Sequence, residues 1–253
     1  ANDTLLLQKA LSSKGLIVNV DDAGTAMRFL TSYFAVRNEH KIIKGTERMH
    51  QRPIRDLVEA LHLIGFRINY LGLAGFPPIE ILPVNFDSLN NKVNIDGSMS
   101  SQFISSLMMI APSLPKGLEI NVTGEIASEP YILLTAALMQ KAGIEVNIRL
   151  PKISIAKQNF ATNILSAGND WTNASYWYAF VALAQSAELI LEGLEEDSAQ
   201  GDKVLMEWGM YFGVKSEFKN GKLHLSKFEV VEQDTLHFDF TAHPDLAQTI
   251  IVI

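Results

Sequence analysis

The chain has 253 residues, 47% of them hydrophobic and 19% charged, which is typical of a folded protein with one large or two medium domains. It has no cysteine, which excludes disulfides, thiolate nucleophiles and cysteine-based zinc sites, and no apolar run reaches the roughly 18 residues of a membrane span. Its formal net charge of −7 and scattered basic residues argue against nucleic-acid binding. We therefore expect a partner among small molecules, and, because no apolar run could span a membrane, a cytoplasmic protein that binds no membrane.

The first predicted element is a helix over LLLQKAL, with Asn2 or Asp3 as its expected N-cap. Further along, short runs rich in Ile, Val and Leu predict strands. These strand candidates are residues 16–20, 41–44, 67–71, 79–82, 92–95, 118–122 and 144–148. Apolar residues at three- and four-residue spacing predict helices that bury one face. The two clearest stripes are Leu57, Ala60, Leu61 and Ile64, and then Leu133, Ala136 and Ala137.

A strand-loop-helix pattern recurs along the chain at a constant interval. It is found in DDAGTAMRFL from Asp21, IDGSMSSQFI from Ile95 and GNDWTNASYW from Gly168. Aligning Asp22, Asp96 and Asp170 gives a spacing of 74 residues twice, by subtraction of their sequence numbers. Matched signals at a fixed period indicate a duplicated unit.

A second series of loops alternates with the first and precedes further helices. Its members are GTERMHQRPI, TGEIASEPYI and EEDSAQGDKV, which lead to Pro53, Pro130 and Asp202. Proline is favoured in a first helical turn, and the expected helix ends are Gly65, Gly143 and Gly213. Each unit then has the order β-α-β-α-β-β, and we expect an α/β or α+β fold.

We expect these units to form two domains, with residues 1–160 as the first and 161–253 as part of the second. The crossing is placed near the polar segment 157–167, which lacks clear periodicity. Continuing the period puts a fourth loop near residue 244, where HPDLAQTIIVI begins another helix. The pattern thus predicts a second domain that is truncated within a helix, and a first helix without a strand before it.

Helix N-termini that open from small-residue loops are natural anion sites, because their free N–H groups point outward. The predicted loops contain Gly24 and Thr25, then Ser98, Ser100, Ser101 and Gln102, and then Ser128. Charge that suits a carboxylate or phosphate comes from Arg28, Arg48 and Arg52. For any single loop, the alternative is that its serines and threonines only cap helices and its arginines lie on solvated faces. The six histidines show no metal-ligand spacing, so we predict no metal and no cofactor.

Taken together, the loop and helix motifs form an ordered series. The series is DAGTAMRFL from Asp22, ERMHQRPIRDL from Glu47, DGSMSSQF from Asp96, TGEIASEPYI from Thr123, NASYW from Asn173 and HPDLAQT from His243. In order and spacing it resembles the 5-enolpyruvylshikimate-3-phosphate synthase family over essentially the whole chain. The resemblance implies two domains of repeated units with substrates bound between them.

The resemblance also implies which residues meet which substrate. Those implied to contact phosphoenolpyruvate are Gly24, Arg52 and Gln102, and those implied to hold shikimate 3-phosphate are Ser100, Ser101, Gln102, Ser128, Tyr131 and Asp245. Asp245 falls on the family's proton-accepting aspartate, which takes the proton of the attacking 5-hydroxyl. The implied reaction transfers the enolpyruvyl group to that hydroxyl by addition and then loss of phosphate, in chorismate and aromatic amino-acid biosynthesis.

Parts of the family pattern have no counterpart in the chain. Its Lys-Ser-x-Ser-Asn-Arg stretch is absent, as are the downstream lysine, glutamate and arginines, and Asp22 stands where many members carry Asn. We therefore expect the chain alone to be an inactive monomer. Two alternatives stay open: the related transferase that acts on UDP-N-acetylglucosamine, which commonly uses a cysteine, and a non-catalytic fragment or binding module. The SMSSQF and RPI motifs favour the shikimate branch.

Overall fold

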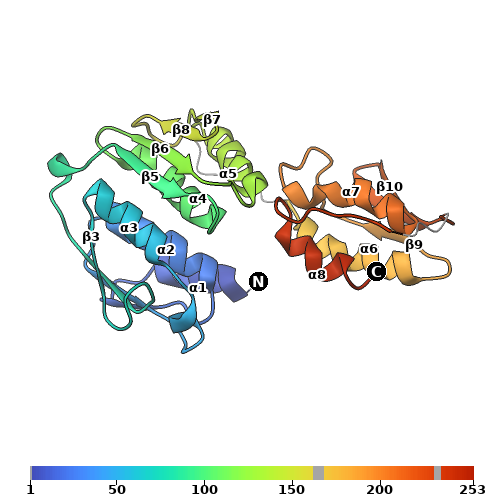
Figure 1. The fold of residues 1–253 in the computed structure, drawn as a ribbon, viewed down its shortest axis with the longest axis horizontal. Helices are drawn as coiled ribbons and strands as arrows, with labels where there is room; N and C mark the ends of the chain where they lie inside the picture. Colours follow the sequence, from blue (N-terminus) through green and yellow to red (C-terminus); the bar gives the residue numbers. More distant parts are fainter. Residues whose placement is uncertain (1, 162–167, 231–234) are drawn as a thin grey trace. The chain divides into compact units, whose positions relative to one another are not determined.

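The computed structural model describes residues 2–161, 168–230 and 235–253, whose strands form three sheets (Figure 1). Contacts divide the chain into two compact units. Unit 1 is Ala1–Ala127 with Leu138–Asn163, and unit 2 is Ser128–Ala137 with Ile164–Ile253. The predicted change of domain near 157–167 falls partly on residues 162–167, which lie outside the described residues. Within the described part of the chain, no helix is long and apolar enough to cross a membrane.

The first half of unit 1 contains one β-α-β-α-β-β repeat after an N-terminal helix. Its elements are α1 (Asn2–Leu11), β1 (Ile17–Asn19), α2 (Gly24–Val36), β2 (Lys41–Lys44), α3 (Arg55–Ile64), β3 (Arg67–Tyr70) and β4 (Ile79–Leu82). The strands form a sheet of order β1-β2-β4-β3, in which β1 and β2 are parallel and the other pairs antiparallel.

The second half of unit 1 repeats this topology. Its elements are β5 (Lys92–Asp96), α4 (Ser101–Ile110), β6 (Leu118–Thr123), α5 (Glu129–Lys141), β7 (Asn147–Arg149) and β8 (Lys152–Ile155). The strand order is β5-β6-β8-β7, again with the first pair parallel and the others antiparallel. The predicted α/β repeat is therefore confirmed, although the division between the units passes through α5.

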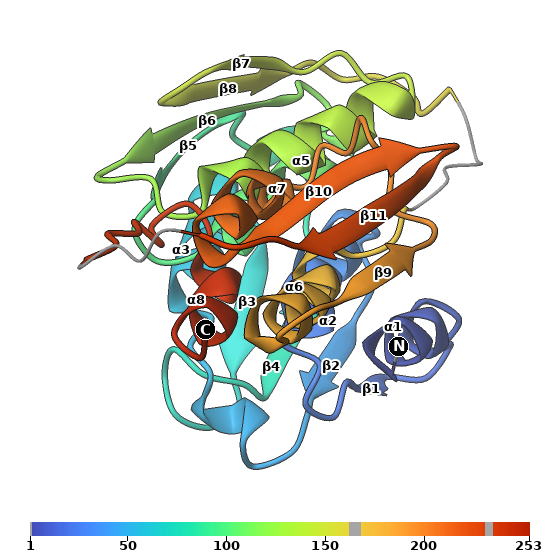
Figure 2. The same ribbon diagram turned by 90° about the vertical axis from the view of Figure 1, so that its right-hand side faces the viewer.

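The helices α2, α3 and α4 of unit 1 lie between its two sheets (Figures 1 and 2). Helix α2 packs directly on α4, and Phe34 of α2 and Phe103 of α4 are both buried. The stripe predicted for α3 is confirmed, because Leu57, Leu61 and Ile64 are fully buried. Burial of these faces fixes how α2 and α4 face each other, which decides where their N-termini lie.

Unit 2 has a third sheet covered by helices. Its further elements are α6 (Trp171–Leu183), β9 (Glu188–Leu191), α7 (Leu205–Trp208), β10 (Val214–Lys219), β11 (Lys222–Lys227) and α8 (Ala247–Ile250), with sheet order β10-β11-β9. Helix α6 packs on this sheet and on α8, and Trp171 and Tyr178 are buried in the core (Figure 2). Among the described residues, no strand before α6 corresponds to β1 or β5.

Some local predictions differ from the structure. Strand β7 begins at Asn147 rather than 144, because Ile144 is buried in the turn that follows α5. In α5 the predicted inward residue Leu133 is 44% exposed, and Ile132 is buried instead. Pro53 does not lie in a first helical turn, since it precedes Ile54, the N-cap of α3. Gly65 and Gly213 do end helices, both with positive φ.

Candidate functional site

The first part of the site lies where β1 and β2 end. Because these strands are parallel, their carboxyl ends share one edge of the sheet. Gly24 begins α2 after β1, and Arg52 lies in the loop after β2. The two loops are joined by a hydrogen bond from the Thr46 N–H to the Asp21 carbonyl, 3.2 Å long. Sequence-distant residues that were predicted to bind one substrate therefore meet at one edge.

The guanidinium of Arg52 packs against the backbone of Gly24. A Cβ at Gly24 would overlap Nη1 and Cζ of Arg52 and lie 2.6 Å from Nη2. Arg52 Nη1 also lies 3.4 Å from the Asp22 carbonyl oxygen, to which it donates. Only glycine leaves room for this arrangement, so the position of the Arg52 guanidinium depends on the absence of a side chain at Gly24.

Arg28 and Gln102 extend the site toward the second repeat. Arg28 Nη1 donates to Gln102 Oε1 over 2.6 Å. Arg28 lies one helical turn after Gly24 on the same face of α2, and the Arg52 guanidinium packs on Gly24. Burial, and secondly the charge of Arg52, lowers the pKa of Arg28. Within the described residues, neither Arg28 nor Arg52 forms an ion pair with a carboxylate. The result is a concentration of positive charge that an anion would stabilise.

The serine loop follows β5 at the corresponding edge of the second sheet. Ser100 is the N-cap residue of α4, yet its side chain makes no capping hydrogen bond, and Ser101 is the first helical residue. Ser98 is held differently, because its N–H donates to Asp96 Oδ1 over 2.8 Å and lowers the pKa of that carboxyl. The hydroxyl of Ser100 is thus left free of the capping role that the alternative interpretation assigned to it.

The capping interpretation holds for other loops. Asp170 caps α6 by accepting from the Thr172 N–H over 3.0 Å, and Arg48 is exposed. Helix α2, in contrast, has Ala23 as its N-cap, with no side-chain hydrogen bond. In unit 1, helices α2, α3 and α4 all begin without a capping side chain, and two of them, α2 and α4, carry Arg28 and its partner Gln102. Such N-termini attract anions through their free N–H groups and dipole.

The remaining predicted residues belong to unit 2. Tyr131 Oη donates to Asp245 Oδ2 over 2.7 Å. Burial, and secondly this hydrogen bond, raises the pKa of Tyr131, so its hydroxyl stays protonated. Asp245 is exposed in the turn Pro244–Leu246, and Ser128, with φ of 58°, donates its N–H to the Thr241 carbonyl over 2.9 Å. The structure therefore brings Tyr131 and Asp245 into contact.

Sequence reasoning missed a buried acidic group beside Asp245. Asp202 is only 3% exposed and accepts a 2.5 Å hydrogen bond from Thr172 Oγ1. Its Oδ1 lies 3.6 Å from His243 Nδ1, too long for a hydrogen bond. Burial is the main cause that raises the pKa of Asp202, and the charge of Asp245 adds to it. The loop EEDSAQGDKV predicted only that a helix begins at Asp202, and no pattern in it indicated that the carboxyl is buried.

The predicted site residues thus form two groups. Gly24, Arg52, Ser100, Ser101 and Gln102 lie in unit 1, where Arg28 donates a hydrogen bond to Gln102. Ser128, Tyr131 and Asp245 lie in unit 2. Each group is polar and suited to an oxygen-rich ligand. Among the described residues, no three histidine or acidic side chains gather in a way that could hold a metal ion.

Comparisons with known proteins agree with this picture. The family model of EPSP synthase (3-phosphoshikimate 1-carboxyvinyltransferase) matches residues 5–252. A Bacteroides fragilis protein named 3-phosphoshikimate 1-carboxyvinyltransferase is 39% identical over 252 residues, covering 99% of this chain and 61% of the relative. A Methanospirillum hungatei protein of the same name is 32% identical over 241 residues, covering 93% of this chain and 55% of the relative.

The fold has a counterpart among solved structures. The EPSP synthase from Acinetobacter baumannii superposes with a TM-score of 0.68 at 15% identity, over 92% of this chain and 54% of that one. At this identity the likeness concerns the fold alone. The chain spans 61% of the length of the Bacteroides fragilis relative and 55% of that of the Methanospirillum hungatei relative.

Proposed function

The chain belongs to the EPSP synthase family, and from that membership we propose that the protein carrying it transfers the enolpyruvyl group of phosphoenolpyruvate to the 5-hydroxyl of shikimate 3-phosphate. The observation that carries the proposal is the guanidinium of Arg52 packed on Gly24, beside Arg28 and the uncapped N-termini of α2 and α4. Phosphoenolpyruvate presents a carboxylate and a phosphate, which match this unpaired positive charge.

In the proposed complex, Arg52 holds an anionic group of phosphoenolpyruvate, and Gly24 lets the guanidinium approach the helix. The Gln102 amide contacts both substrates. Ser100, Ser101, Ser128 and Tyr131 bind shikimate 3-phosphate through hydroxyl and N–H groups. These contacts fix two anionic reactants in one geometry, which is how an enzyme lowers the entropic barrier to their reaction.

In the proposed reaction, the 5-hydroxyl oxygen adds to C2 of phosphoenolpyruvate while its methylene carbon gains a proton. Asp245 accepts the hydroxyl proton, and its other oxygen is positioned by Tyr131. Loss of a proton from the new methyl group and departure of phosphate then restore the double bond. No residue of this chain is assigned as the proton donor to the methylene carbon.

The test is phosphate release by the protein expressed from its complete gene, with phosphoenolpyruvate and either shikimate 3-phosphate or UDP-N-acetylglucosamine as acceptor. We expect turnover with shikimate 3-phosphate only, and an enolpyruvyl ether identified by mass spectrometry. Turnover with the amino sugar alone would assign the chain to the related transferase. Release with neither acceptor would support a non-catalytic role.

The 253-residue chain should behave differently from the complete protein. The relatives named 3-phosphoshikimate 1-carboxyvinyltransferase are longer, since this chain spans 61% of the one from Bacteroides fragilis. We propose that the chain alone binds shikimate 3-phosphate weakly, in the millimolar range, without measurable turnover. Calorimetric titration beside a phosphate-release assay tests this, and turnover by the chain alone would contradict it.

A further inference from the structure

Arg28 of α2 makes three contacts with residues of α4. Its Nη1 donates to Gln102 Oε1 over 2.6 Å, and its guanidinium lies over the Phe103 ring, 5.4 Å from the centroid. Its backbone carbonyl accepts from Ser106 Oγ over 3.1 Å. The first two contacts hold the side chain of Arg28 against α4, and the third joins its backbone to the same helix.

The contact decides which way the Gln102 amide points. A guanidinium has donors but no acceptor, so the amide atom that faces Arg28 must be the oxygen. The amide NH2 then points away from Arg28, and within the described residues it donates to no protein acceptor. An oxygen in that place would repel an anionic substrate, whereas an NH2 group can donate two hydrogen bonds.

We propose that Arg28 is a positioning residue that acts through Gln102, by fixing its side-chain amide with the NH2 group toward the anionic substrates. This inference rests on the proposed function. It assigns a role to the side chain of Arg28, whose Nη1 donates to another residue of the protein, Gln102. Without Arg28, the Gln102 amide is free to rotate and loses its preference for donating.

The experiment is a double-mutant cycle in the complete protein, with the variants Arg28→Ala, Gln102→Ala and both together. We expect each single variant to lower kcat/KM for phosphoenolpyruvate by roughly tenfold to a hundredfold. If Arg28 acts through Gln102, the double variant is no more than about threefold worse than Gln102→Ala. Losses that multiply in the double variant would overturn the proposal.

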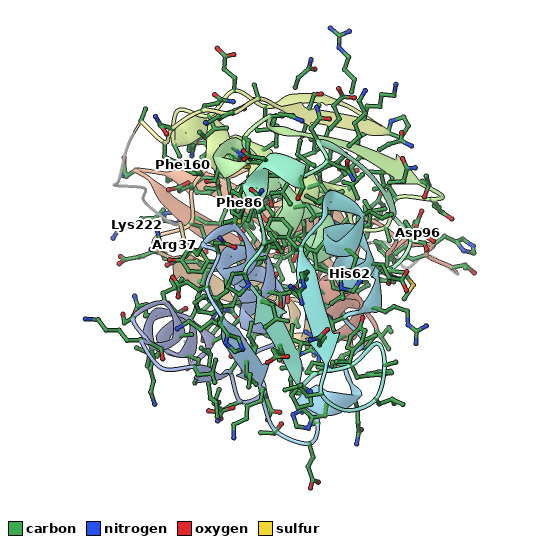
Figure 3. All side chains as sticks on the ribbon, turned by 90° about the vertical axis from the view of Figure 1, so that its left-hand side faces the viewer. Arg37, His62, Phe86, Asp96, Phe160 and Lys222 are labelled. Atoms are coloured by element: carbon green, nitrogen blue, oxygen red, sulfur yellow. The ribbon has the colours of Figure 1, made fainter. Side chains whose placement is uncertain are left out.

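A matched control is Arg37→Ala, which removes the same charge from the other end of the same helix. Arg37 is exposed, lies beside Glu39 at 3.4 Å, and is on the opposite side of unit 1 from Asp96 (Figure 3). It should leave kcat/KM unchanged. An Arg28→Ala variant equally unaffected would also overturn the proposal. Arg28→Lys, whose ammonium group can still donate to Gln102 Oε1, should recover part of the activity.

The outcomes separate this inference from the proposed function. Absence of turnover by the wild-type protein with phosphoenolpyruvate and shikimate 3-phosphate contradicts the function. Turnover by the wild type together with independent effects of Arg28 and Gln102 contradicts the positioning role alone. If Arg28→Ala does not fold, the cycle is run with Arg28→Lys, and the same comparison with Gln102→Ala decides.

Discussion

The hydroxyls of Ser32 and Ser106 form a hydrogen bond 2.6 Å long, and the two residues are 74 positions apart. The same separation joins Arg28 to Gln102 and Ser175 to Thr249. It equals the spacing of the repeated loops in the sequence. Equivalent positions of successive repeats therefore face each other where α2 packs on α4, and again where α6 packs on α8.

The buried serine pair predicts a non-additive effect on stability. Ser106→Ala leaves the Ser32 hydroxyl without this partner and should lower the free energy of unfolding by about 1 to 3 kcal/mol. The variant that carries Ser32→Ala as well should recover most of that loss, because no buried hydroxyl is then left without its partner. Urea unfolding followed by circular dichroism, with hydrogen exchange of α2 and α4, measures this. A double variant less stable than either single one would refute the account.

Gly24→Ala tests the contact with Arg52. The added Cβ would overlap the guanidinium, which must swing away because the helix backbone cannot. We expect the KM for phosphoenolpyruvate to rise about tenfold or more, with little change in the KM for shikimate 3-phosphate. Gly15→Ala is the matched control, since the nearest atom to a Cβ there, Ser13 Oγ, is 3.7 Å away. Equal effects of the two variants would contradict the prediction.

Arg52→Ala tests the assignment of the anionic substrate. Loss of a charge-assisted contact worth about 1.5 to 3 kcal/mol should weaken phosphoenolpyruvate by roughly tenfold to a hundredfold. Shikimate 3-phosphate should be affected much less. The exposed Arg48 of the same loop provides the control variant Arg48→Ala. Steady-state kinetics with each substrate varied in turn decide, and equal weakening of both substrates would show that Arg52 is misassigned.

Tyr131→Phe tests how the proposed base is held. The variant removes the 2.7 Å hydrogen bond to Asp245 Oδ2. Turnover should fall by about tenfold to a hundredfold, because hydrogen bonds to a charged group are worth about 1.5 to 3 kcal/mol. Tyr176→Phe, which removes an exposed hydroxyl that accepts from Gln248 Nε2 over 3.0 Å, serves as control. Unchanged turnover in Tyr131→Phe would contradict the prediction that Tyr131 positions Asp245.

Asp202→Asn tests the buried carboxyl through the pH dependence of stability. Its pKa in the folded state is raised above the ordinary value of 3.8, so its contribution is present below 3.8 and lost as the pH rises through the folded pKa. The variant should therefore match the wild type near pH 3 and be more stable at pH 7. The three tryptophans, Trp171, Trp177 and Trp208, all lie in unit 2, so their fluorescence during urea unfolding reports on this unit.

Asp239→Asn is a control of opposite sign. Hydrogen bonds from Thr241 lower the pKa of the Asp239 carboxyl, so its contribution is present at neutral pH and lost as the pH falls through the folded pKa. This variant should be the less stable one at pH 7 and match the wild type in acid. An Asp202→Asn difference that is the same at both pH values would show that the buried carboxyl is not the cause.

Much of the fold could be predicted because its strands are apolar runs between turn residues. Strands β2 and β4 begin and end at the predicted residues, and the helix start at HPDLAQ is confirmed by Pro244–Leu246 and α8. The hairpin β10-β11 was missed although Asn220 and Gly221, with φ of 52° and 73°, form its turn. Both strands contain several lysines, so they lack the apolar run that predicted the other strands, although Leu223 and Leu225 are buried.

The site was predictable only in part. The parallel order of β1 and β2 is enough to place Gly24 and Arg52 at one edge. The contact between Arg28 and Gln102 could not be predicted, because it depends on the register in which α2 and α4 pack. Asp202 was likewise hidden, since nothing in the sequence distinguishes a buried aspartate from one that begins a helix on the surface.

The meeting of equivalent positions places a condition on how the two halves of unit 1 can differ. Where two copies of one sequence face each other across an axis, a residue beside that axis meets itself, and its side chain must be compatible with its own copy. Serine meets this condition at Ser32 and Ser106, because a hydroxyl both donates and accepts. Arginine cannot, since it only donates and repels its copy. Arg28 and Gln102 are therefore equivalent positions at which the two halves of unit 1 differ. The first half has the charged donor Arg28, and the second half has its acceptor, the Gln102 amide oxygen. This difference makes the anion site polar, with its positive charge on the first half.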